Sequence, residues 1–74
     1  MNNKNIHAVP SGNNWAVRRE GAQRASSIHS TQGAAADAAR QTAAREHGEA
    51  FIHRPNGEIR DRSSYGNDPF PPIG

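Results

Sequence analysis

The sequence contains no cysteine and no leucine, only one lysine, and few aromatic residues, which make up 5% of its 74 residues. Without cysteine the chain can form no disulfide, no thiolate metal site and no thiol nucleophile. No stretch approaches the ~20 apolar residues that cross a bilayer, and the first five residues lack the apolar segment of a secretory signal. We therefore expect one small cytoplasmic domain that does not contact a membrane.

Large apolar side chains are scarce, because hydrophobic residues form 32% of the chain and half of them are alanine. A single core in a chain below ~80 residues rarely supplies more than about 3–5 kcal/mol. A core this poor is badly suited to enclosing a dry pocket, and no serine stands in a nucleophile-elbow motif. We expect no enzymatic activity, no cofactor and no small-molecule substrate.

Arginine supplies most of the nine basic residues, which oppose seven acidic ones and leave a net charge of +2. A net charge this small bears on solubility and gives little support to nucleic-acid binding. Guanidinium groups nevertheless suit bidentate contacts with carboxylates and phosphates. Nucleic-acid binding therefore stays open as an alternative function.

Alternating residues bounded by turn signals predict strands before and after one helix. Residues 6–9 and 15–19 flank a Gly/Asn-rich turn and predict a hairpin, in which Trp15 and Val17 face one side and Ala16 and Arg18 the other. Residues 25–29 are expected to return as a third strand. Residues 49–53 and 58–62 predict the second hairpin.

The turn of that second hairpin reads Arg54-Pro55-Asn56-Gly57. Asn-Gly favours a type I′ turn with both residues at positive φ. This turn pairs His53 with Arg60 and Ile52 with Asp61. It places Ala50, Ile52 and Ile59 on one face of the sheet, and on the other face Phe51, His53, Arg60 and Arg62.

Thr31 is predicted to cap a helix that runs from Ala34 to Glu46, and Gly48 is predicted to end it. At 100° per residue one helix face holds Ala35, Ala38, Ala39, Thr42 and Ala43. An alanine face lets the helix lie close to a sheet but buries little area. The bulk is expected to come from Trp15, Val17, Ile28, Ile52 and Ile59.

The predicted fold is therefore α+β, a small antiparallel sheet of four or five short strands in two hairpins, with one Ala-rich helix packed on one face. Residues 1–5 are predicted to be a disordered lead, and residues 6–65 a single small domain. Residues 66–74 hold three prolines and are predicted to be a Pro-rich C-terminal tail.

The four histidines, at positions 7, 29, 47 and 53, are scattered along the chain. None shows the H-x-x-x-H spacing of a zinc site, so we expect no metal site. His47 is interpreted as a favourable charge at the negative end of the helix dipole. His53 is interpreted as a cross-strand neighbour of Arg60.

Two surfaces emerge as candidates for binding. One is a basic, aromatic sheet face of the kind that single-stranded nucleic-acid binders use. The interpretation favoured over a free basic face is that Glu20, Glu58 and Asp61 neutralise it in cross-strand pairs. The other is the tail, which could serve as a ligand for another protein or pack on its own domain or a second copy. The combined partner-binding set is Arg18, Phe51, His53, Arg60, Arg62, Tyr65 and Phe70. The nucleic-acid set is Arg18, Arg19, Arg24, Arg60 and Arg62.

Five blocks carry a resemblance to a known family: His7-Ala8-Val9-Pro10; Trp15-Ala16-Val17-Arg18; Thr31-Gln32 with Ala35 and Ala39; Ile52-His53 with Asn56-Gly57-Glu58-Ile59; and Ser64-Tyr65-Gly66-Asn67-Asp68-Pro69. Over about residues 6–72 the chain resembles a small bacterial family of domains of unknown function, of the DUF2188 type. That family has no established activity, so the resemblance implies kinship and leaves function open. A looser likeness to the arm-binding domains of phage integrases is confined to Trp15-Ala16-Val17 and Thr31 with Ala35.

The sequence thus predicts a non-enzymatic binding module of a bacterial cell or prophage, which acts in protein–protein interaction or regulation. Its partner is expected to be another protein or a second copy in a homodimer. The alternative is a nucleic-acid-binding protein that uses an Arg-rich sheet face.

Overall fold

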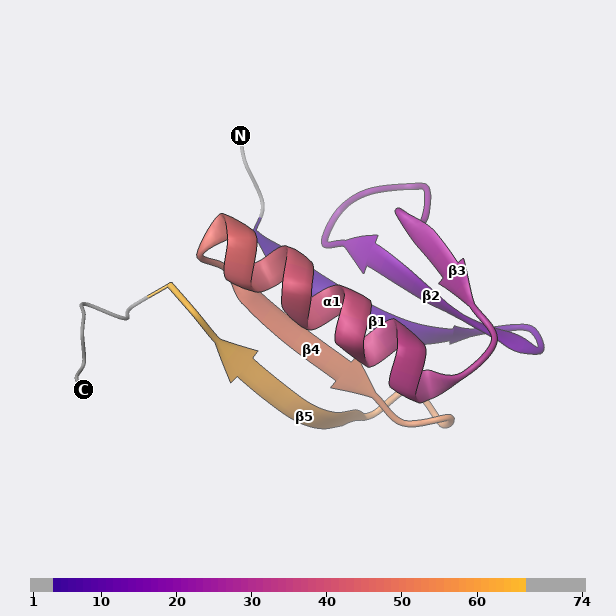
Figure 1. The fold of residues 1–74 in the computed structure, drawn as a ribbon. Coiled ribbons are helices and arrows are strands. Elements are labelled where there is room, and N and C mark those ends of the chain that lie inside the picture. Colours follow the sequence, from indigo (N-terminus) through magenta and orange to yellow (C-terminus); the bar gives the residue numbers. More distant parts are fainter. Residues whose placement is uncertain (1–3, 67–74) are drawn as a thin grey trace.

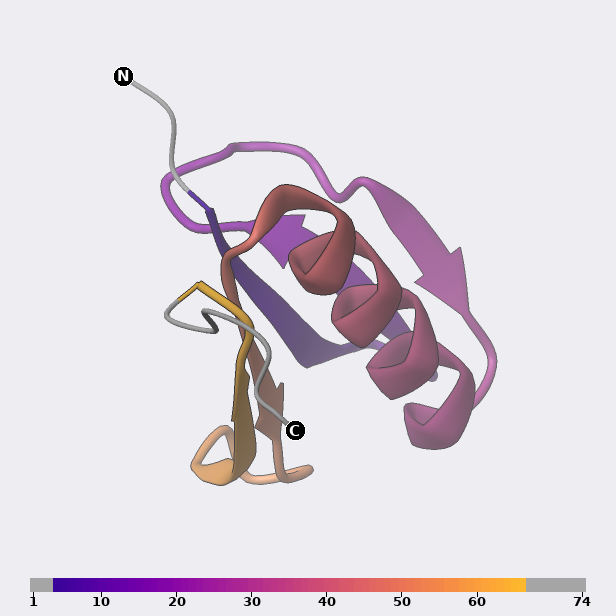
Figure 2. The same ribbon diagram turned by 60° about the vertical axis from the view of Figure 1, so that its left-hand side comes forward.

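The structure is a computed structural model that describes residues 4–66. Its elements follow in the order β1 (Asn5–Ser11), β2 (Asn14–Arg19), β3 (Ser27–His29), α1 (Gln32–Glu46), β4 (Glu49–His53) and β5 (Ile59–Ser64). The strands form one sheet in the order β3-β2-β1-β4-β5, and α1 lies across one face of it (Figure 1 and Figure 2). The predicted α+β class with one helix on a sheet is confirmed.

The sheet is mixed and not antiparallel throughout, because β1 and β4 pair in parallel. Both predicted hairpins, β1–β2 and β4–β5, are antiparallel. The parallel pair follows from the chain path: β3 runs in the direction of β1, and α1 then carries the chain back across the sheet. The next strand therefore starts at the same end as β1, as in other strand–helix–strand connections.

The first strand extends through Pro10 to Ser11, beyond the predicted stop at Pro10. Pro10 opposes Trp15 of β2, whereas β4 pairs with β1 only from Asn5 to Ala8. Within residues 4–66 no strand therefore pairs with Pro10 on the β4 side, and its missing N–H costs no ladder hydrogen bond to β4.

The helix begins where the sequence predicts a cap, since the Thr31 hydroxyl accepts a hydrogen bond from Ala34 N–H at 3.1 Å. At the other end the left-handed residue is His47 (φ 59°), and not the predicted Gly48. Gly48 has a different role. A Cβ there would lie 2.0 Å from the carbonyl oxygen of Lys4, so glycine permits the close approach that starts the β1–β4 pairing.

The core lies between α1 and the sheet, and Ile6, Val17 and Ile52 are its largest fully buried side chains. Ala35, Ala39 and Ala43 are buried on the predicted helix face, together with Ala36. Partly buried Trp15, Ala38 and Tyr65 pack against this cluster. Two residues expected in the core are instead exposed, namely Ile28 (55%) and Ile59 (53%).

The second hairpin explains the position of Ile59. Gly57 N–H donates to the Arg54 carbonyl at 2.8 Å, and of residues 54–57 only Gly57 has positive φ, so Pro55 and Asn56 are the central turn residues. The fixed negative φ of proline suits the first central position of a type I turn. A type I′ turn, as predicted, would need positive φ at Asn56 as well as at Gly57, and Asn56 does not have it. Ile52 opposes Asp61 as predicted, but a register shift makes His53 oppose Ile59 in place of Arg60.

Ile28 is exposed for a simpler reason. In β3 it opposes Ala16 of β2, while its neighbour His29 opposes Trp15. Because side chains alternate along a strand, His29 shares the helix side with Trp15 and Ile28 shares the opposite side with Ala16.

Candidate binding surface

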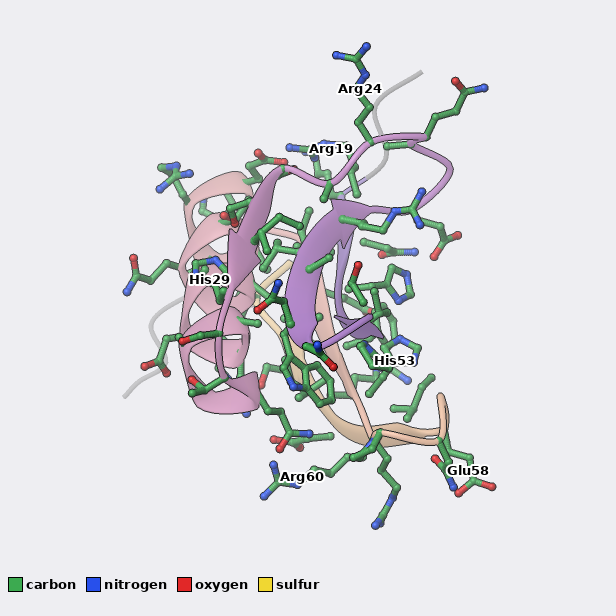
Figure 3. All side chains as sticks on the ribbon, turned by 90° about the vertical axis from the view of Figure 1, so that its right-hand side faces the viewer. Arg19, Arg24, His29, His53, Glu58 and Arg60 are labelled. Atoms are coloured by element: carbon green, nitrogen blue, oxygen red, sulfur yellow. The ribbon has the colours of Figure 1, made fainter. Side chains whose placement is uncertain are left out.

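One face of the sheet is packed against α1, and no element within residues 4–66 lies over the other face, which we call the open face (Figure 2). The registers and strand alternation place the following side chains on it: His7, Val9, Arg18, Ile28, Phe51, His53, Ile59 and Arg62. Figure 3 shows His53 on the side of the sheet away from the helix and His29 on the helix side.

A row of three side chains crosses the open face from β1 through β4 to β5. His7 opposes Phe51 in the parallel pair, and Phe51 opposes Arg62 in the antiparallel pair. The imidazole stacks on the Phe51 ring with centroids 4.9 Å apart and planes 17° apart. The Arg62 guanidinium carbon lies 5.8 Å from the same ring centroid, within the range of a cation–π contact.

A chain of short polar contacts runs beside this row. His7 Nε2 is 3.0 Å from Glu20 Oε1, and His7 Nδ1 is 3.0 Å from His53 Nε2. His53 Nδ1 is in turn 2.9 Å from the carbonyl oxygen of Gly57. These contacts join β1, the end of β2 and the β4–β5 turn across the open face.

Sequence reasoning missed this histidine pair, because His7 and His53 are 46 residues apart. Their contact depends on the parallel pairing of β1 with β4, in which Ala8 opposes Ile52. One sequence signal was available. Each histidine directly follows a core isoleucine, His7 after Ile6 and His53 after Ile52, so both histidines lie on the face opposite the core.

Arg18 and Arg62 are the two arginines of the open face, and both are held by the protein. Arg18 Nη2 donates to the carbonyl oxygens of Ala22 and Gln23, each at 2.9 Å. Arg62 Nη2 lies 3.4 Å from Glu49 Oε2. Beside Arg18 is a hollow of about 320 Å³, lined by His7, Val9, Arg18, Arg19, Glu20, Gly21 and Ala22.

The other predicted nucleic-acid contacts lie elsewhere. Arg19 makes two hydrogen bonds to Glu46 of α1, at 2.6 and 2.7 Å. Arg60 Nη1 donates to Gln32 Oε1 of α1 at 3.0 Å, because the register shift turns it toward the helix. Arg24 extends away from the sheet in the β2–β3 loop (Figure 3). The five predicted nucleic-acid contacts therefore do not form one surface, and only Arg18 and Arg62 of them lie on the open face.

Glu46 and Arg19 hold each other in their charged forms. The hydrogen bonds from Arg19 lower the pKa of Glu46 below its ordinary value, and the same bonds raise the pKa of Arg19. The pair joins the end of β2 to the last turn of α1.

The predicted carboxylate partners are also redistributed. Glu20 contacts His7, and Asp61 pairs with Arg40 of the helix at 2.8 Å.

Tyr65, which the sequence placed on the binding surface, packs against the core, and its backbone N–H donates to the Gly48 carbonyl at 2.9 Å. Phe70 lies outside the described residues. The structure therefore brings together four of the predicted partner-binding residues, namely Arg18, Phe51, His53 and Arg62.

Neither a clustered metal site nor a membrane-spanning helix is present in the described residues. Among residues 4–66 no group of three or more His, Cys, Asp or Glu side chains is placed to hold a metal ion. Within the same range no helix has the length and apolar character needed to span a bilayer.

These features define a class: a small α+β module with one helix-covered sheet face and one open face. The chain belongs to the DUF2188 family, described as an uncharacterized protein conserved in bacteria, whose model matches residues 6–65. Comparison with curated proteins and comparison with solved structures gave no match.

Proposed function

We propose that this bacterial chain is a non-enzymatic binding module whose open face docks a protein partner. The observation that carries this proposal is the composition of that face. Phe51 lies between His7 and Arg62, and two aliphatic residues, Ile28 and Ile59, are more than half exposed on the flanking strands. Aromatic residues and arginine are enriched in protein interfaces, where exposed apolar groups lose their contact with water.

The partner we favour is a second copy of the chain. Among residues 4–66 the largest fully buried side chains are Ile6, Val17 and Ile52, so covering Ile28 and Ile59 would add apolar burial to a small core. The open face also carries both charges, since the Arg62 side chain is 60% exposed and the Glu20 side chain 49% exposed. In a twofold dimer the same surface of each copy faces the other, so the Arg62 guanidinium of one copy can contact the Glu20 carboxylate of the second.

Sedimentation velocity across a wide concentration range tests this proposal. We expect a dimer that dissociates on dilution and that Ile59→Asp abolishes, because Ile59 is exposed and the change leaves the core intact. Gln41→Asp is the matched control, since Gln41 is exposed on α1. A monomer at every concentration, or a dimer that Ile59→Asp leaves unchanged, would overturn the assignment of the second copy.

A nucleic-acid partner is the second candidate, favoured by one observation: Arg62 lies over an aromatic ring on an open sheet face. Single-stranded nucleic-acid binders combine stacking rings with arginines in this way. Against it, most of the predicted arginines contact the protein itself.

Sedimentation with a labelled pool of mixed DNA and RNA at low and moderate salt separates the two. Phosphate contacts weaken steeply as salt rises, whereas apolar contacts between proteins change little. A salt-sensitive shift that is lost when Arg18 and Arg62 are both changed to Glu, and kept in Arg45→Glu, would replace the protein partner by nucleic acid.

A further inference from the structure

The hydrogen bonds of the His7–His53 pair fix which ring nitrogens carry protons. His7 Nε2 faces a carboxylate oxygen of Glu20, which accepts, so this nitrogen carries hydrogen. His53 Nδ1 faces the carbonyl oxygen of Gly57, which also accepts, so this nitrogen carries hydrogen as well.

A neutral imidazole has only one N–H, so the two remaining nitrogens both present lone pairs. These are His7 Nδ1 and His53 Nε2, which lie 3.0 Å apart. Two lone pairs at that separation repel each other unless a cation lies between them. The cation is either one additional proton or a metal ion.

We propose that His7 and His53 form a two-histidine site for a divalent transition-metal ion, with Glu20 and the Gly57 carbonyl as its outer hydrogen-bond partners. This inference is independent of the proposed function, because it requires neither a second copy nor a nucleic acid. It departs from the expectation of no metal site, which rested on spacing along the chain and took no account of which strands are neighbours.

The distances suit such an ion. Zinc–imidazole bonds measure roughly 2.0–2.1 Å, which separates two ligating nitrogens by about 2.9 Å at a right angle and about 3.3 Å at the tetrahedral angle. The observed 3.0 Å lies within this interval. The separation of the two nitrogens therefore already suits two ligands of one ion.

The surroundings match those of metal-bound histidines, which usually donate their second N–H to a carboxylate or a backbone carbonyl. Glu20 supplies the first and Gly57 the second. The His7 side chain is 21% exposed and is stacked on Phe51, which fixes the plane of one ligand. Water fills the remaining coordination positions, so the site favours ions that prefer imidazole, such as Zn²⁺, Ni²⁺ and Cu²⁺.

The test uses the untagged full chain and two readouts, calorimetric titration with Zn²⁺ or Ni²⁺ and ¹⁵N–¹H spectra of the histidine side chains with Zn²⁺. We expect saturable binding with signals of His7 and His53 moving, while those of His29 and His47 stay in place. With Zn²⁺ bound, the spectra should show hydrogen on Nε2 of His7 and on Nδ1 of His53, the nitrogens that face Glu20 and the Gly57 carbonyl. Acidification should weaken binding, since the ligating imidazoles must be neutral.

Four variants test which residues bind the metal ion. His7→Gln and His53→Gln should each abolish saturable binding, and Glu20→Gln should weaken it by about tenfold or more through loss of an outer partner. His47→Asn is the matched control, because asparagine tolerates the left-handed conformation of that residue. Backbone amide spectra of each variant confirm that the fold is retained.

Three outcomes would overturn the proposal. Binding that survives His53→Gln would place the metal elsewhere, and equal responses from all four histidines would indicate nonspecific binding. An absence of binding, with spectra that show a charged imidazolium in the pair, would identify the cation as a proton.

Discussion

At the scale of single residues, the contact between Arg19 and Glu46 stands out because both guanidinium nitrogens take part. The two side chains are 36% and 30% exposed, so water reaches the pair only in part. Fork-to-fork pairs of this kind are more directional than single contacts between exposed charges. The pair connects residues 27 positions apart and so acts on the tertiary structure.

The lowered pKa of Glu46 predicts a stability contribution that depends on pH. A carboxyl whose pKa is lower in the folded state stabilises the fold above its unfolded pKa of about 4.3. That contribution is lost as pH falls through the folded value. We expect Glu46→Gln to lower the free energy of unfolding at pH 7 and to make progressively less difference on acidification, in urea titrations at several pH values.

Glu58→Gln, in the exposed β4–β5 turn, is the matched control for loss of one negative charge. A deficit in Glu46→Gln that is equally large at pH 7 and at pH 3 would contradict the role given to the Arg19 contact.

Two isoleucines in neighbouring strands give a second prediction at this scale. Ile52 is 1% exposed and Ile59 is 53% exposed. Ile52→Ala should cost about 2–5 kcal/mol, which is most of the stability that a core of this size supplies. Ile59→Ala should change the free energy of unfolding by no more than about 0.5 kcal/mol, as is usual for surface positions.

Urea unfolding of both variants, followed by circular dichroism at a concentration where the chain is monomeric, measures this contrast. Equal losses in the two variants would mean that Ile59 belongs to the core and that the register of β5 is wrong.

At the scale of elements, two glycines with opposite requirements lie at the two ends of α1. Gly33 is in the first turn of the helix, and a Cβ there would meet nothing within 4 Å. Gly48 follows the helix, and a Cβ there would lie 2.0 Å from the Lys4 carbonyl oxygen and 2.6 Å from the Lys4 Cβ. Glu49 N–H also donates to that carbonyl, at 3.0 Å, so the backbones are already close.

Substitution by alanine should therefore have opposite effects on the stability of the protein at these two positions. Gly33→Ala should stabilise the protein by roughly 0.5–1 kcal/mol, since glycine within a helix is less favourable than alanine by that amount. Gly48→Ala should destabilise it, because the start of β4 has to move away from the chain that leads into β1. Thermal unfolding of the two variants side by side measures both signs, and a gain in Gly48→Ala would disprove the close approach.

The elements also show what the sequence could and could not predict. The two hairpins, the cap at Thr31 and the buried face of Ala35, Ala39 and Ala43 follow from local patterns, and the structure confirms them. Local patterns do not specify which distant strands become neighbours, so the β1–β4 pair and the histidine contact were not predictable.

In the second hairpin the prediction placed the centre of the turn one residue too far along the chain. Two turn centres are compatible with the sequence, Asn56-Gly57 and Pro55-Asn56. The fixed φ of Pro55 favours Pro55-Asn56, which the structure has. Side chains alternate between faces, so the resulting shift exchanged the positions of Ile59 and Arg60. Of the predicted arginine surface, Arg60 moved to the helix side through that shift, whereas Arg62 stayed on the open face.

At the scale of the whole molecule, the sheet has a face that packs on α1 and a face that carries His7, Phe51 and Arg62. If a second copy covers the open face, folding and association are linked by mass action. The melting temperature should then rise with protein concentration in the natural sequence and stay constant in Ile59→Asp. Scanning calorimetry at several concentrations measures this, and a constant melting temperature in both would contradict association.

The alanines between α1 and the sheet have a consequence for how the chain tolerates change. Ala8, Ala39, Ala43 and Ala50 are completely buried, and the helix lies near the sheet because these side chains are small. An alanine side chain is a single methyl group, so at these positions almost nothing can be removed, in contrast to Ile52. Each added carbon would push two packed surfaces apart. At these alanine positions an upper limit on size restricts which residues can replace them, whereas removal of atoms is costly at the large core residues Ile6, Val17 and Ile52.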